Sequence, residues 1–208
     1  YYIFIWILWL LLVRNKGIGF KNKIPWGVTK DIKYFRILTQ GYFNDNAIIM
    51  GKNTAFSIPR SLPKRTNYVV SSTLLKPKTQ KEKFITQGGY GNFNIIQKSD
   101  LHMLTKKNYG DIWIIGGAEL YSGLINSHLI NAIYYTDIDK EFECDTFFPV
   151  IPSKFKKIYH SPTIKSEDID MSFKVYVNEQ NVIYPNYKDY KEKAKVALHY
   201  TNSTLGIL

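Results

Sequence analysis

An acidic side chain lies on an apolar helix face near the start of the sequence. Asp31, Phe35 and Leu38 are spaced i, i+4, i+7 in a segment whose pattern predicts a helix beginning near Thr29, and Ile32 borders that face. An acid is also common in a first helical turn, where the helix dipole favours it. If Asp31 instead lines an apolar cleft, burial raises its pKa, and hydrogen bonds to a ligand favour its charged form. It would then suit binding of a protonated heterocycle.

Two glycine turns follow apolar strand patterns. The segment 51–54 (GKNT) follows NAIIM, and the segment 116–117 (GG) follows DIWII. Glycine lets the backbone approach a ligand closely, and free N–H groups at a helix start favour a phosphate. Lys52 adds positive charge, and Thr54 could cap the next helix. Each turn could equally be an ordinary strand–helix connection, because neither matches G-x-G-x-x-G.

Other kinds of catalytic site find no support in the sequence. The four histidines are scattered, and with the single Cys144 they offer no metal-ligand spacing. No Ser/His/Asp arrangement or nucleophile elbow is present. We therefore expect neither metal nor acyl-transfer chemistry.

Strand patterns alternate with helix patterns through the middle of the chain. Apolar strands are predicted at 46–50, 66–71, 93–97, 111–115 and 132–138, with helices at 101–107 and 118–125. This alternation predicts a parallel sheet, whose ligands bind beyond the carboxyl ends of the strands. The segments 154–160 and 171–177 look like antiparallel partners, and 76–83 (KPKTQKEK) looks like a basic surface loop.

The two ends of the chain differ from the middle. Residues 1–13 form an unbroken apolar run, which is shorter than the roughly 20 residues of a transmembrane helix. We predict a fully buried strand in the second half of this run. Residues 178–208 are rich in Lys and Tyr, and the stretch 188–200 could form an amphipathic helix or a linker.

Composition excludes several classes of protein. Apolar residues make up 45% of the 208 residues and aromatic residues 15%, which is too much for a disordered chain. One cysteine rules out a disulfide scaffold and fits a reducing compartment. The net charge of +11 permits nucleic-acid binding, but the aromatics lie mainly inside strand patterns, so we expect no nucleic-acid partner.

Taken in order, the motifs resemble the dihydrofolate reductase family. The resemblance begins with 15–19 (NKGIG), 23–26 (KIPW), Asp31 and Phe35, and continues through 47–59 (AIIMGKNTAFSIP). It goes on through 60–72, 112–121 (IWIIGGAELY), 134–139 (YYTDID) and 142–149 (FECDTFFP). It covers residues 8 to 177 in the right order.

The resemblance implies the fold and the division of the chain. We expect an α/β fold with a central, mostly parallel eight-stranded sheet, an antiparallel C-terminal strand and about four flanking helices. The reductase domain would span 8–177, after an apolar segment 1–7 and before a basic extension or linker 178–208.

The resemblance also implies the reaction and four catalytic residues, Asp31, Trp26, Tyr121 and Thr136. The family reduces dihydrofolate to tetrahydrofolate by hydride transfer from NADPH, for one-carbon metabolism and thymidylate synthesis. Asp31 would hydrogen-bond N3 and the 2-amino group of the pterin, and Thr136 would support that amino group. Trp26 would hold an ordered water, and Tyr121 would position cofactor and substrate.

Further residues would hold the two ligands. The substrate would contact Ile32, Phe35, Ile58, Leu62, Arg65 and Ile115, with Arg65 pairing in bidentate fashion with the glutamate α-carboxylate. NADPH would contact Leu11, Ile18, Gly19, Ile24, Gly51, Lys52, Asn53, Thr54, Val70, Ser71, Ser72, Gly116, Gly117, Ala118, Glu119 and Leu120. Residues 19–24 would form a mobile loop over nicotinamide, and Lys52 with Ser71 and Ser72 would favour the 2′-phosphate of NADP.

The sequence departs from the family pattern at three positions and leaves alternatives open. Leu11 stands where the family usually has a small alanine, Ala55 replaces a tryptophan, and Asn53 replaces a second basic residue. The alternatives are a reductase of another pterin-like or pyrimidine substrate, half of a bifunctional reductase–thymidylate synthase, and a low-activity relative that binds folate and NADPH. We expect a cytoplasmic monomer without a metal, and no membrane partner unless residues 1–13 belong to a longer apolar segment.

Overall fold

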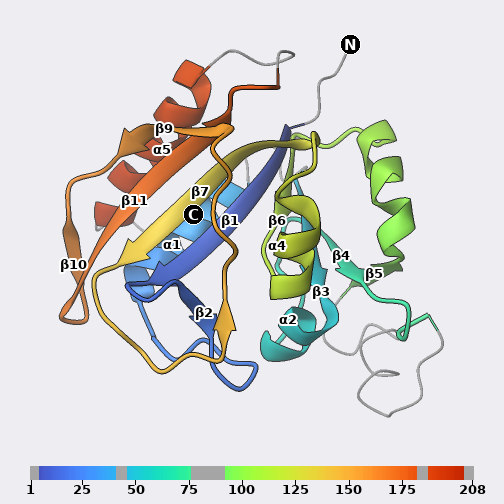
Figure 1. Ribbon diagram of the computed structural model, residues 1–208, viewed down its shortest axis with the longest axis horizontal. Helices are drawn as coiled ribbons and strands as arrows, with labels where there is room; N and C mark the ends of the chain where they lie inside the picture. Colours follow the sequence, from blue (N-terminus) through green and yellow to red (C-terminus); the bar gives the residue numbers. More distant parts are fainter. Residues whose placement is uncertain (1–4, 41–45, 76–91, 182–186, 204–208) are drawn as a thin grey trace.

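A twisted sheet with helices on both faces forms the core of the protein (Figure 1). The computed structural model describes residues 5–40, 46–75, 92–181 and 187–203. Within these ranges the main sheet has nine strands, eight of them in the order β10-β11-β7-β1-β6-β3-β4-β5, and β9 pairs with β11. The strands are β1 (Ile5–Val13), β3 (Ala47–Gly51), β4 (Thr66–Val70), β5 (Phe93–Ile96), β6 (Asp111–Ile114), β7 (Ile130–Ile138), β9 (Phe155–His160), β10 (Ile164–Ser166) and β11 (Ile169–Asn178).

The pairing confirms a mostly parallel sheet with an antiparallel C-terminal part. β1 pairs in parallel with β6 and β7, and the parallel arrangement continues through β3, β4 and β5. β11 runs antiparallel to β7, and both β9 and β10 pair with β11 along its other edge. The predicted antiparallel pair at the end of the chain is therefore β9 and β11.

Residues 5–13 of the apolar run at the start of the chain form the central strand β1. Its odd-numbered side chains pack into one core cluster and its even-numbered side chains into the other, so that both faces are buried. This explains why the run lacks alternation with polar residues. The strand begins at Ile5, three residues before the predicted domain boundary at residue 8, and Ile5 pairs with Asp111.

Helices cover the two faces of the sheet. α1 (Thr29–Gln40) and α5 (Tyr187–Asn202) pack on one face, and η1 (Lys98–Lys106) and α4 (Ala118–Leu124) contribute to the cluster on the other. α2 (Lys52–Ser57) follows β3 directly, with Gly51 at its N-cap position, so the prediction of Thr54 as N-cap was wrong. The helix predicted at 101–107 is a 3-10 helix that begins at Lys98.

A second, two-stranded sheet was missed in the sequence. β2 (Gly17–Gly19) pairs antiparallel with β8 (Thr146–Phe147), and both strands are too short to show a pattern. The basic segment 76–83 lies outside the described residues. No helix in the described part of the chain is long and apolar enough to cross a membrane.

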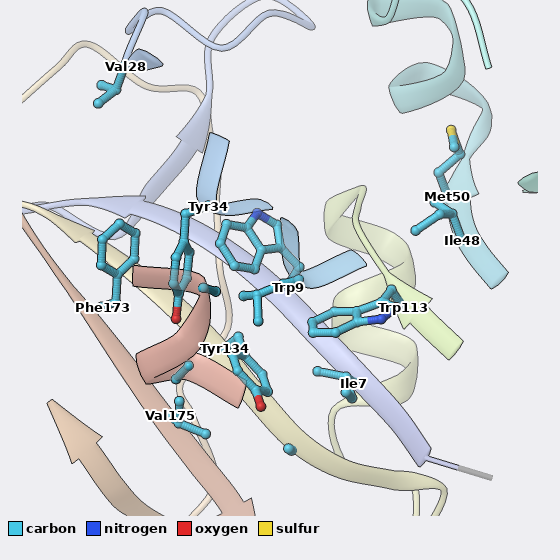
Figure 2. Packing of buried hydrophobic residues seen from close by; sticks show 14 of the residues in the cluster. Ile7, Trp9, Val28, Tyr34, Ile48, Met50, Trp113, Tyr134, Phe173 and Val175 are labelled. Atoms are coloured by element: carbon cyan, nitrogen blue, oxygen red, sulfur yellow. The ribbon is translucent and has the colours of Figure 1, made fainter. Parts of the chain in front are cut away.

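Aromatic rings fill the core between the sheet and α1. Tyr34 stands between Trp9 and Phe173, with ring centroids 5.6 Å and 3.8 Å apart (Figure 2). Because Tyr34 is on α1, Trp9 on β1 and Phe173 on β11, this stack fixes α1 against the sheet.

Candidate active site

A buried acid–hydroxyl pair lies between α1 and the central sheet. The hydroxyl of Thr136 donates a 2.7 Å hydrogen bond to Asp31 Oδ1. Asp31 is 4% exposed and Thr136 is fully buried. Burial raises the pKa of Asp31 to about 7, against the opposing effect of the Thr136 hydrogen bond, which favours the charged form. A carboxyl group of this kind changes charge near neutral pH and can bind a cationic or protonated ligand group.

A hairpin remote in sequence holds the start of α1, where Asp31 lies. The residue before the helix is Val28, which has no side-chain acceptor for the first N–H groups. Instead, Glu167 Oε2 accepts from the backbone N–H of Thr29 at 3.2 Å, and Ser166 Oγ from that of Lys30 at 3.4 Å. No local pattern in the sequence indicates this cap, because Ser166 ends β10 and Glu167 lies in the turn between β10 and β11.

Four residues of the predicted substrate wall share one core cluster. Phe35, Ile58, Leu62 and Ile115 are half-buried and pack against the same core cluster. The Phe35 and Trp9 rings are 5.3 Å apart. Ile32 is 63% exposed and therefore lies at the rim.

Arg65 is held at the edge of this wall. Its Nη1 donates to Thr39 Oγ1 at 2.7 Å and its Nε to the Pro63 carbonyl at 3.0 Å. The guanidinium lies 5.9 Å from the centre of the Phe35 ring. Burial, with repulsion from Arg36, lowers the pKa of Arg65 to about 10, so the group stays charged at neutral pH. A partly buried cation of this kind suits a carboxylate.

The two glycine turns meet at the carboxyl ends of their strands. The Gly51 N–H donates to the Gly116 carbonyl at 2.8 Å. Gly116 has φ +134°, and a Cβ added there would lie 3.0 Å from Thr54 Oγ1. The turns therefore form one backbone surface, together with Gly117 and the half-buried Ala118 at the start of α4.

A cation and two hydroxyls stand beside this surface. Lys52 Nζ donates to Thr73 Oγ1 at 3.1 Å, and Thr73 Oγ1 lies 3.1 Å from Ser71 Oγ. Ser72 is exposed in the same turn, and Val70 ends β4 just before it. Thr73 was missed in the sequence, although it continues the hydroxyl-bearing run Ser71-Ser72.

The two remaining predicted catalytic residues, Tyr121 and Trp26, are both buried. The Tyr121 hydroxyl donates to the Trp9 carbonyl at 2.7 Å, and burial raises its pKa. Trp26 is buried, and its indole N–H has no hydrogen-bond acceptor among the described residues. A polar group buried in this way fits a bound water or ligand atom.

Residues 19–24 form a tight turn next to the β2–β8 sheet. Phe20 and Lys23 exchange two backbone hydrogen bonds, of 2.9 Å and 3.0 Å, and Lys21 and Asn22 have positive φ. This is the geometry of a type I′ turn. The Asp145 side chain accepts from the Lys21 N–H at 2.8 Å, and Ile24 is 59% exposed at the end of the turn.

Other predicted cofactor contacts fall into two groups. Leu11 pairs in register with Thr136, and like Ile18 it is half-buried. Asn53 and Glu119 are exposed. The Leu120 side chain is buried in the cluster on the other face of the sheet, so only its backbone lies near the glycine turn.

In the described ranges no group of three or more His, Cys, Asp or Glu side chains could hold a metal ion.

Comparison with known proteins settles the family. A family model described as "Dihydrofolate reductase" matches residues 5–179. The chain belongs to the dihydrofolate reductase family. The general reaction of dihydrofolate reductases is the NADPH-dependent reduction of dihydrofolate.

Several relatives are named for this activity. The chain is 32% identical to the dihydrofolate reductase of Drosophila melanogaster, an alignment that covers 84% of this chain and 91% of the relative. It is 30% identical to the Aedes albopictus dihydrofolate reductase, with 87% and 94% covered. A bifunctional dihydrofolate reductase-thymidylate synthase of Daucus carota is 30% identical, and the match covers 82% of this chain and 33% of that protein.

Proposed function

We propose that this chain reduces dihydrofolate to tetrahydrofolate with NADPH and so supports one-carbon metabolism and thymidylate synthesis. The observation that carries the proposal is the buried Asp31–Thr136 pair at the end of an apolar wall. Its chemistry matches the pterin edge, which offers a ring N–H and an amino group to a carboxylate.

Asp31 and Thr136 would fix the pterin. The ionised carboxylate of Asp31 accepts hydrogen bonds from N3 and the 2-amino group and raises the basicity of N5 through its charge. Thr136 orients the carboxylate by its 2.7 Å hydrogen bond. Trp26 would hold a water near the substrate with its indole N–H, which has no acceptor in the described part of the chain.

The joined glycine turns would hold NADPH. Their fit rests on the close backbone contact of Gly51 and Gly116 and on the cation and hydroxyls of Lys52, Ser71 and Thr73, which suit the 2′-phosphate. When bound, NADPH supplies the hydride that C6 of dihydrofolate accepts while N5 is protonated. Tyr121 would position both ligands, with its hydroxyl fixed on the Trp9 carbonyl.

The other end of the substrate would lie along the apolar wall. Phe35, Ile58, Leu62 and Ile115 would contact the aminobenzoyl ring, and Ile32 would cover it at the rim. Arg65 would pair with the glutamate carboxylate. Residues 19–24 would close over nicotinamide and exclude water.

We further propose that the chain is a cytoplasmic monomer. Light scattering at several concentrations and fractionation of the source cells test these two statements separately. A mass above that of one chain, or enrichment in a membrane or organelle fraction, would contradict them.

The decisive experiment compares the protein with the variant Asp31→Asn. NADPH oxidation should require dihydrofolate and should stop with the folate analogue methotrexate. Asp31→Asn should bind NADPH as the unchanged protein does, whereas single-turnover hydride transfer near neutral pH should slow on the order of 100-fold or more. Equal single-turnover rates in the two proteins would refute the role of Asp31. Tight methotrexate binding without turnover would instead indicate a relative that only binds the ligands.

A further inference from the structure

The C-terminal helix α5 is an addition to the part of the chain that defines the family. The family match ends at residue 179, whereas α5 spans Tyr187–Asn202. Its inner side carries Tyr190, Ala194, Ala197 and Thr201, which follow helical spacing and are all at most 4% exposed. A stripe buried to this degree shows that α5 is seated firmly on the domain.

One partner of α5 is α1, the helix that carries Asp31. Lys33 Nζ donates a 2.7 Å hydrogen bond to the carbonyl oxygen of Ser203, directly after the C-terminus of α5. The last carbonyls of a helix carry partial negative charge, so a lysine is favourable there. Lys33 is only two residues from Asp31, and the bond therefore ties the first half of α1 to the far end of α5.

On the sheet side, α5 packs against β11 and β9 and is hydrogen-bonded to β7, the strand that carries Thr136. The buried hydroxyl of Tyr134 donates to the Tyr190 carbonyl at 2.9 Å, near the start of α5. Residues two apart in a strand point to the same face, so Tyr134 and Thr136 share the face that meets α1. In Figure 2 the pale red helix passes beside Tyr34 and Tyr134. Lys193 adds a 2.5 Å ion pair with the buried Asp111 at the start of β6.

We propose that α5 is a positioning element for the active site, which clamps α1 onto β7 so that Asp31 and Thr136 stay in contact and water stays out. The two anchors of α5 join the same two elements that the Asp31–Thr136 hydrogen bond joins. The catalytic consequence rests on the proposed function, whereas the effect on the Asp31 environment does not. Burial is the larger influence on the pKa of Asp31 and raises it, whereas the Thr136 hydrogen bond lowers it, so unseating α5 should lower the pKa on balance.

A wedge in the α5 interface tests this proposal in the full chain. The double substitution Ala194→Leu, Ala197→Leu keeps α5 helical, because leucine is a good helix former, but leaves no room for α5 to seat. Lys191→Leu places the same side chain on the exposed side of α5 and serves as the matched control. The readout is the carboxyl 13C titration of Asp31 in the ligand-free protein, with the signal identified by its loss in Asp31→Asn.

We expect the wedge to lower the Asp31 midpoint by about one pH unit or more, from about 7 toward 3.8, because water then reaches the carboxylate. Lys191→Leu should leave it in place. The wedge should also lower kcat on the order of 10-fold or more, with the KM for NADPH unchanged, since only the pterin side of the site moves.

Two milder variants keep the test decisive if the wedge protein does not fold. Lys33→Met and Tyr134→Phe each remove one anchor and should shift the Asp31 midpoint in the same direction by less, and further when combined. Hydrogen exchange reports whether α5 has loosened. Loosened α5 amides with an unmoved Asp31 midpoint would overturn the proposal. If the variants shift the Asp31 midpoint but the unsubstituted protein does not reduce dihydrofolate, the proposed function is refuted and the role of α5 in positioning Asp31 stands.

Discussion

Thr136 reaches Asp31 across 105 positions of sequence and donates to its carboxylate at 2.7 Å. The bond joins α1 to β7, and both residues are buried. A carboxylate kept there has a cost in stability, because the unfolded chain solvates the charge better than the folded protein does. Function and stability therefore oppose each other at this residue.

Asp31→Asn should stabilise the ligand-free protein, and more so as the pH rises. The folded pKa is about 7 and the ordinary value is 3.8, so between these values the folded state binds more protons than the unfolded state. Stability from Asp31 is then fully present below 3.8 and is lost as the pH rises to about 7. At about 1.4 kcal/mol per unit of pKa difference, the variant should gain on the order of 2–4 kcal/mol between about pH 4 and pH 8.

Urea denaturation of both proteins at several pH values measures this difference, and the comparison near pH 4 serves as the internal control. A gap between the two proteins that stays constant from pH 4 to pH 8 would show that Asp31 does not titrate in this range.

Gly116→Ala should damage the joined glycine turns. The residue has φ +134°, which an L side chain rarely adopts, and the added Cβ would press on Thr54 Oγ1 at 3.0 Å. We expect a loss of about 1–3 kcal/mol in the free energy of unfolding and weaker NADPH binding. Gly27→Ala is the matched control, because a Cβ there meets nothing within 4 Å. Equal stability and equal NADPH affinity of the two variants would contradict this account.

The sequence was most informative where a single element carries the signal. The spacing of Asp31, Phe35 and Leu38 placed the acid on the inner face of α1, and α1 begins at Thr29 as predicted. The second half of the apolar run predicted a strand buried on both faces, and β1 confirms it, although the strand begins earlier, at Ile5. Strand–helix alternation predicted the parallel sheet, because each crossover leaves its own local pattern.

Contacts between remote segments could not be inferred in this way. Thr136 was assigned to the site, as a support for the pterin 2-amino group, only through the family resemblance. Its hydrogen bond to Asp31 was not predicted, since no spacing rule links α1 to β7. The Ser166 and Glu167 hydrogen bonds to the start of α1 span 136 and 138 positions of sequence. The Thr73 hydroxyl could be assigned to the site only after the structure placed it next to Lys52.

Lys52→Met should weaken the binding of NADPH but leave the binding of NADH unchanged. Lys52 stands with Ser71 and Thr73 at the ends of β3 and β4, and a charged hydrogen bond to the 2′-phosphate would be lost. We expect the Kd for NADPH to rise roughly 10- to 100-fold and the Kd for NADH to stay unchanged. Lys157→Met is the matched control, because Lys157 is exposed on β9 and its substitution also removes one positive charge. Similar weakening by both variants, or of both cofactors, would place the 2′-phosphate elsewhere.

Glu167→Ala should loosen the start of α1. Glu167 Oε2 accepts from the Thr29 N–H, and its hydrogen bonds with Ser166 and Thr29 lower the pKa of this carboxyl below the ordinary 4.5. A lowered folded pKa means that the stabilisation is present above 4.5 and is lost as the pH falls through the folded value. We expect Tm to fall by roughly 2–6 °C at neutral pH and by less in acid.

Asp168→Ala is the matched control for this cap, because Asp168 is exposed in the same turn and has a positive φ like Glu167. Any cost of alanine in the turn itself is therefore common to both variants, and the excess loss in Glu167→Ala measures the bond to α1. Glu167→Gln keeps an oxygen acceptor and should recover part of the loss. Hydrogen exchange of the Thr29 and Lys30 amides should rise in Glu167→Ala alone, and equal exchange in the two alanine variants would assign the cap to Ser166 rather than to Glu167.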